Sequence, residues 1–134
     1  MTKNFLELTG PWTGLSVQSG MRIQESITLT ITPHHIEGLG ADNDGDFVLD
    51  GSYDARRQRV SLTRRYTWTS NGTEDGVGVP YQYDGYWDGE MVVGAWHQRD
   101  YPANQGTFEM WPDKPKEEEM YNLEELNLEI SATK

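Results

Sequence analysis

The chain has 134 residues, a net charge of −11 at pH 7 and no cysteine. This length suits one domain with its own core, and the lack of cysteine excludes disulfides and thiolate metal sites. The acidic charge argues against nucleic-acid binding, which needs a basic surface. No stretch approaches the roughly 20 apolar residues of a membrane helix, and the N-terminus lacks the apolar segment of a secretory signal. We therefore expect a cytoplasmic protein that binds neither nucleic acid nor membrane.

Apolar and polar residues alternate with a period of two from Trp12 to Trp111, interrupted by turn-forming residues. This pattern predicts an all-β fold. The expected strands span, in chain order, 12–18, 25–32, 35–41, 46–54, 59–67, 80–87, 90–98 and 106–111. Sequential hairpins without a helical crossover favour an eight-stranded antiparallel up-and-down β-barrel. An open two-sheet sandwich of the same strands is the alternative.

Alternating aspartates at Asp42, Asp44 and Asp46 resemble the start of an EF-hand calcium loop. Such a loop needs glycine at its sixth position and glutamate at its twelfth, where this chain has Phe47 and Tyr53. We therefore expect a tight turn rather than a metal site, and no metal.

The Asp88-Gly89 dipeptide is the strongest hairpin signal in the chain. It predicts a two-residue type I′ turn that places Trp87 opposite Glu90. Similar turns at Pro33-His34 and Arg56-Arg57 fix the other registers, and opposed residues share one face of the sheet. Glycines fall on this inward face in most strands, which permits the strong coiling of a small closed sheet.

The inward residues divide between the two ends of the barrel. Those near Asp88-Gly89 are mostly apolar and predict a filled base; they are Trp12, Ile31, Ile36, Tyr53, Val60, Trp87, Val92 and Met110. The opposite end combines polar and aromatic side chains, as small-molecule pockets do. The candidate ligand-binding residues there are Gln18, Glu25, Arg64, Tyr66, Tyr81, Tyr83, Trp96 and Phe108.

Three functions are compatible with this arrangement. The first is a non-enzymatic binding module for a small apolar or aromatic ligand, whose carboxylate, if it has one, would meet the Arg64 guanidinium. The second is a structural or protein-interaction domain whose interior is filled, with Glu25 paired to Arg64 and homo-oligomer formation left open. The third is an enzyme with Glu25 or a tyrosine as acid or base. No nucleophile elbow, P-loop or dinucleotide motif occurs, so we expect no cofactor.

Five short motifs between about residues 11 and 112 give the chain a family resemblance. They are Trp12-Thr13-Gly14, Gly38 through Phe47, Tyr83-Asp84-Gly85, Gly94-Ala95-Trp96 and Gly106-Thr107-Phe108. The pattern resembles the calycin superfamily of lipocalins and avidins, most of all small avidin-like domains, with one extra residue in the second motif. The resemblance implies the barrel fold. It does not imply biotin binding, because avidin's hydroxyl and amide ligands find no residue-by-residue match here.

An acidic extension follows the barrel domain, which we expect to span residues 1–112. Residues 113–134 carry one apolar spacing typical of a helix, through Met120, Leu123 and Leu126, and one typical of a strand, through Leu126, Leu128 and Ile130. Helix, strand and free acidic tail therefore all stay open.

Overall fold

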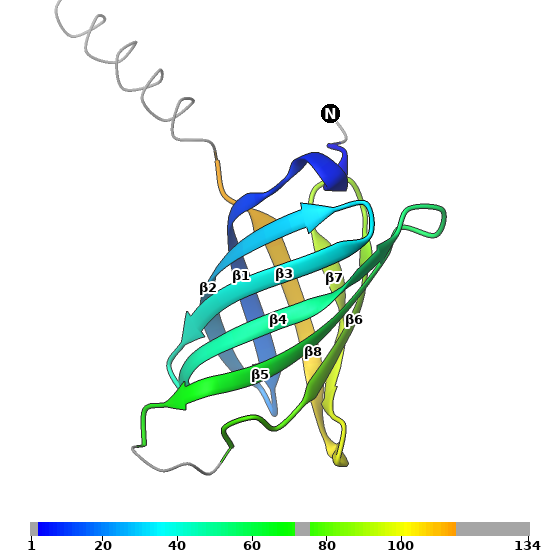
Figure 1. The fold of residues 1–134 in the computed structure, drawn as a ribbon. Helices are drawn as coiled ribbons and strands as arrows, with labels where there is room; N and C mark the ends of the chain where they lie inside the picture. Colours follow the sequence, from blue (N-terminus) through cyan, green and yellow to red (C-terminus); the bar gives the residue numbers. More distant parts are fainter. Residues whose placement is uncertain (1–2, 72–75, 115–134) are drawn as a thin grey trace, which may run out of the picture.

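A computed structural model describes residues 3–71 and 76–114, and it confirms the predicted eight-stranded antiparallel barrel (Figure 1). Each strand pairs with the next, and the last closes on the first. The strands are β1 (Gly10–Gln18), β2 (Met21–Thr32), β3 (His35–Asp42), β4 (Gly45–Asp54), β5 (Arg59–Thr69), β6 (Tyr81–Trp87), β7 (Val92–Gln98) and β8 (Tyr101–Pro112). A short 3₁₀ helix, η1 (Phe5–Glu7), precedes them. No helix in the described part of the chain is long and apolar enough to cross a membrane. The tail forms left open above lie outside the described residues.

Most of the predicted strand pairing is confirmed. The register places Ile31 opposite Ile36, Gly40 opposite Phe47 and Tyr53 opposite Val60. These pairs set the inward face, and the side chains on it form the buried core.

The aspartate-rich stretch forms the expected turn between β3 and β4. The Asp42 carboxylate accepts hydrogen bonds from the backbone N–H groups of Asp44 (2.8 Å) and Gly45 (3.1 Å). This is the usual way in which aspartate stabilises a turn.

The predicted turn at Asp88-Gly89 is wrong in length. Trp87 lies opposite Val92 instead of Glu90, and the turn comprises residues 88–91. The Asp88 carboxylate accepts hydrogen bonds from the N–H groups of Glu90 and Met91, both at 2.8 Å, and this stabilises the longer turn. Glu90 is therefore exposed in the turn. The shift of two residues leaves every other inward residue of β7 on its face, because the strand period is also two.

Two strands begin at least four residues earlier than their sequence pattern predicts. β2 begins at Met21 because Ser19 (φ 50°) and Gly20 (φ 81°) make a two-residue turn from left-handed conformations. β8 begins at Tyr101, although Pro102 cannot donate a ladder hydrogen bond. An irregularity between His97 and Gln98 lets this segment pair with β7.

Aromatic side chains fill the end of the barrel that carries the β2–β3, β4–β5 and β6–β7 turns, here called the closed end. η1 lies across it (Figure 1), and the Phe5 ring lies 4.4 Å from Tyr53, 5.6 Å from Trp87 and 5.8 Å from Trp12. The indole N–H groups of Trp12 and Trp87 donate to the carbonyls of Leu8 (2.8 Å) and Lys3 (3.0 Å). This end is therefore packed and its polar groups are satisfied.

A cavity at the mouth of the barrel

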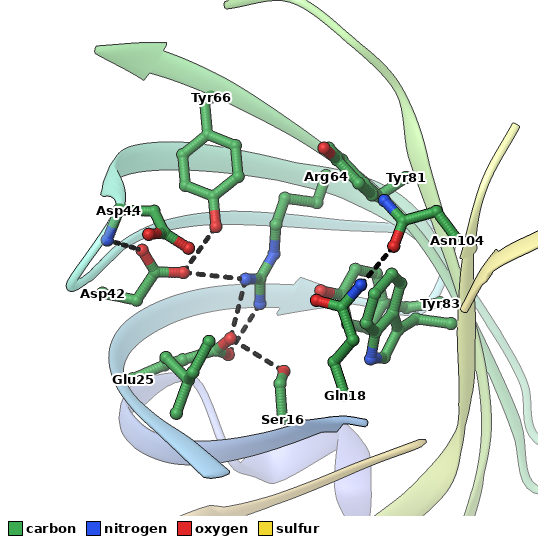
Figure 2. Close-up of a pocket in the computed structure, with 12 residues that line it drawn as sticks. Ser16, Gln18, Glu25, Asp42, Asp44, Arg64, Tyr66, Tyr81, Tyr83 and Asn104 are labelled. Carbon is green, nitrogen blue, oxygen red and sulfur yellow. Dashed lines mark hydrogen bonds and ion pairs between the residues drawn. The ribbon is translucent and has the colours of Figure 1, made fainter. Parts of the chain in front are cut away.

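The opposite end, here called the mouth, contains a cavity of about 100 Å³. Gln18 and Asp42, at the ends of β1 and β3, and Asp44, in the β3–β4 turn, stand around it (Figure 2). The side chains around it come from most of the strands. They are Ser16, Gln18, Ile23, Glu25, Asp42, Asp44, Arg64, Tyr66, Tyr81, Tyr83, Trp96 and Asn104.

An ion pair forms the floor of the cavity. Two nitrogen atoms of Arg64, Nη1 and Nη2, donate to the two carboxylate oxygens of Glu25, each at 2.7 Å. The hydroxyl of Ser16 donates to the same carboxylate at 2.8 Å. Glu25 and Arg64 are only 4% and 3% exposed. Two parallel hydrogen bonds between a guanidinium and a carboxylate are a strong geometry, and they offset the cost of burying both charges.

The Arg64 guanidinium also lies between two aromatic rings. Its central carbon is 3.7 Å from the centroid of the Phe47 ring and 4.5 Å from that of Tyr83. Both distances allow cation–π attraction. Burial alone would lower the pKa of Arg64, but the Tyr83 and Glu25 contacts outweigh it and raise that pKa. Arg64 is therefore a fixed positive charge.

Two aspartates lie beside the ion pair: Asp42, at the end of β3 with its side chain only 2% exposed, and Asp44, in the β3–β4 turn. The Asp42 carboxylate accepts a hydrogen bond from the Tyr66 hydroxyl at 2.5 Å and a longer one from Arg64 Nη1 at 3.4 Å. Asp44 lines the cavity beside it (Figure 2) and is exposed. Among the described residues, no side chain donates to the Asp44 carboxylate or forms an ion pair with it.

Three aromatic rings stand at steep angles to one another along the wall. Tyr66 and Tyr81 are 6.2 Å apart at 90°, and Tyr81 and Trp96 are 6.1 Å apart at 67°. Burial raises the pKa of Tyr66, Tyr81 and Tyr83, with smaller contributions from nearby acids such as Asp42 and Asp44. The three hydroxyls therefore stay protonated at neutral pH.

Two buried N–H groups beside the cavity have no hydrogen-bond partner in the described structure. They are Trp96 Nε1 and Arg64 Nε. Trp96 is 6% exposed. Its indole N–H has no partner in the described structure, whereas those of Trp12 and Trp87 donate to carbonyls at the closed end. Because buried donors are nearly always satisfied, each exception calls for a physical explanation.

Seven of the eight residues predicted from the sequence line this cavity. They are Gln18, Glu25, Arg64, Tyr66, Tyr81, Tyr83 and Trp96. Phe108 lies below it, packed edge-on against Tyr83 at 5.1 Å. The ion pair considered from the sequence, between Glu25 and Arg64, is present.

Sequence reasoning missed five lining residues. They are Ser16, Ile23, Asp42, Asp44 and Asn104. Asp42 follows Gly40 by two positions, so the inward alternation, extended past the predicted strand end, would have found it. The same extension reaches Ile23 from Glu25 and Asn104 from Gly106.

Glu25 and the buried tyrosines are poorly placed to act as acid–base groups. A general base needs a free acceptor, whereas both oxygens of Glu25 already accept hydrogen bonds. The tyrosines keep their protons because their pKa values are raised. No protein-family model, curated protein or solved structure matches the chain, so the interpretation of the site depends on its own geometry.

Proposed function

We propose that this protein is a non-enzymatic barrel that binds a small molecule in the cavity at its mouth. One observation carries the proposal, namely that the two ends of the barrel differ. The closed end is packed by Phe5, Trp12 and Trp87, whereas the mouth keeps a cavity lined by aromatic and polar groups.

The size of the cavity limits the ligand. Sites for drug-sized molecules enclose about 300–1,000 Å³, while this cavity encloses about 100 Å³. The ligand is therefore a molecule of a few heavy atoms, or a small group of a larger molecule whose remainder stays in solvent. The resemblance to the calycin superfamily supports the same proposal, since eight-stranded barrels of this kind hold one small ligand.

A thermal-shift screen of small ligands tests the proposal. A ligand that binds only the folded protein raises the melting temperature, and at a hundred times its Kd it adds about 2.7 kcal/mol to the free energy of unfolding. We expect Tyr81→Leu at the mouth to abolish the increase. Tyr53→Leu is the matched control, because Tyr53 is a half-buried tyrosine at the closed end. If no compound stabilises the protein, or if only Tyr53→Leu removes the effect, the proposal is wrong.

A protein-interaction domain is the second candidate. The outer wall exposes large apolar side chains, among them Leu39 (65% exposed) and Trp68 (56%). Exposed apolar surface of this kind can mark a protein contact. Measurement of the solution mass tests this candidate directly, since a concentration-independent monomer would count against self-association through this wall.

A further inference from the structure

The charged groups around the cavity do not balance. Among the described residues that line it, three are acidic, Glu25, Asp42 and Asp44, and one is basic, Arg64. Glu25 and Arg64 neutralise each other through two short hydrogen bonds. Asp42 accepts hydrogen bonds from two backbone N–H groups and from the Tyr66 hydroxyl, but its contact with a positive charge is a single one of 3.4 Å to the same guanidinium. Asp44 has no partner of opposite charge among the described residues. A negative potential therefore remains at the mouth.

Arg64, the basic residue among those described in the cavity lining, is not free to bind an anionic ligand. Arg64 Nη1 and Nη2 are both engaged by carboxylates, and aromatic rings cover the guanidinium. A ligand carboxylate would have to displace Glu25 and leave it buried without a partner, which is costly. It would also approach the carboxylates of Asp42 and Asp44.

The aromatic wall is suited to a positive charge. Tyr66, Tyr81 and Trp96 line the cavity together, at steep angles to one another. Proteins recognise quaternary ammonium compounds with aromatic residues clustered around one space, because the ring quadrupole attracts a positive charge. The charge of Asp44 beside Tyr81 adds to that attraction.

Resting on the proposed function, we infer that the mouth binds a small organic cation: an ammonium group among Tyr66, Tyr81 and Trp96, near Asp42 and Asp44. The cation balances the negative charge that remains once Glu25 and Arg64 have paired. A small quaternary ammonium compound carries such a group in few heavy atoms, as the cavity requires.

Three probes of nearly equal shape test the inference, by ligand-observed NMR titration of the full chain. They are choline, its neutral carbon isostere 3,3-dimethylbutan-1-ol, and the anion 3,3-dimethylbutanoate. We expect choline to bind about tenfold more tightly than the alcohol or more, because cation–π and charge attraction act on it alone. We expect the anion to bind most weakly. Choline binding should also weaken as salt is added, since Asp44 is exposed to solvent.

A pair of aspartate variants locates the effect. Asp44→Asn should weaken choline binding about three- to tenfold and leave the alcohol unaffected, because it removes a nearby charge and keeps the shape. Asp46→Asn is the matched control, an exposed aspartate two residues away that does not line the cavity. Circular dichroism verifies that both variants are folded.

Each other outcome overturns the inference. If the alcohol binds as tightly as choline and Asp44→Asn changes nothing, the cation inference fails while the proposed binding function stands. If the carboxylate binds best, the acidic ligand expected from the sequence is correct instead. If none of the three binds, the inference fails, and the thermal-shift comparison of Tyr81→Leu with Tyr53→Leu decides separately whether the binding function fails too.

Discussion

Arg64 is the residue on which the interior of the barrel depends. It connects strands that are not neighbours, because Glu25 lies on β2 and Arg64 on β5. Its guanidinium also fills the space between Phe47 and Tyr83. The acidic ligand expected from the sequence would meet this guanidinium, but Glu25 already occupies it.

We predict that Arg64→Met destabilises the protein by about 3–5 kcal/mol, because it leaves the Glu25 carboxylate buried without its partner. The double variant Glu25→Leu/Arg64→Met should recover most of that loss, since apolar residues of similar size often replace a buried ion pair at little cost. Urea unfolding followed by tryptophan fluorescence measures both. Wild-type stability in the single variant would contradict the structural role of the pair.

The inward positions of Arg64 and Glu25 were predictable from the sequence, but their contact was not. Strand alternation was sufficient to place Arg64 and Glu25 on the inward face. It could not show that they meet, because the pairing depends on how the sheet closes. The turn between Asp42 and Gly45 was correctly predicted. A residue in or beside a turn can also line a cavity, however, and no local sequence pattern distinguishes the two roles.

At the scale of single elements, the turns decide the register. The β6–β7 turn is longer than a two-residue hairpin because the Asp88 carboxylate accepts two backbone N–H groups. These two hydrogen bonds, from Met91 and Glu90, lower the pKa of Asp88. η1 was not predicted from the sequence, because a three-residue helix is too short to show a helical period. The first residues of β8 were not predicted either, because proline at position 102 is unusual inside a strand.

We expect Asp88→Ala to lower the free energy of unfolding by about 1 kcal/mol, since it removes the acceptor of two exposed hydrogen bonds. Because the pKa of Asp88 is lowered in the folded state, its contribution is complete above the unfolded pKa of about 3.9. That contribution is lost as pH falls through the lower, folded value. Urea unfolding at neutral and acid pH should show the gap between wild type and variant narrowing in acid. Asp46→Ala is the control.

Neighbouring strands also approach each other closely at several glycines. A methyl group added at Gly51 would lie 1.8 Å from the carbonyl oxygen of Ser61, and one added at Gly94 would lie 2.0 Å from that of Asp84. Because these neighbours are backbone atoms, they cannot move aside. Gly94→Ala should therefore destabilise the barrel by about 1–3 kcal/mol, which is typical of an overpacked site. Thermal melting measures the effect. A melting temperature equal to that of wild type would show that the strands can separate to make room for the methyl group.

At the scale of the whole molecule, buried tyrosines make the barrel sensitive to alkali. Burial raises the pKa of Tyr53, Tyr66, Tyr81 and Tyr83 in the folded state. The stability that these groups contribute is fully present below the unfolded tyrosine pKa of about 10. It is lost as pH rises from there through the folded values.

We therefore expect the tyrosinate absorbance of these four residues to appear together with the loss of β-sheet circular dichroism above about pH 10. Gradual ionisation of all tyrosines near pH 10, with the sheet intact, would contradict the burial of these four side chains.

The fold class itself was predictable from the sequence, because alternation and turn residues act over short distances. The difference between a packed end and an end with a cavity was only partly so, since it depends on contacts across the barrel.

The indole N–H resonances of the tryptophans provide the most direct test of binding at the mouth. Trp96 lines the cavity and its N–H is unpartnered, while those of Trp12 and Trp87 donate to carbonyls at the closed end. In a titration with choline, we expect the Trp96 indole resonance to shift and saturate while the resonances of Trp12 and Trp87 stay in place. An unmoved Trp96 resonance, or equal shifts at all three indoles, would contradict binding of the cation at the mouth.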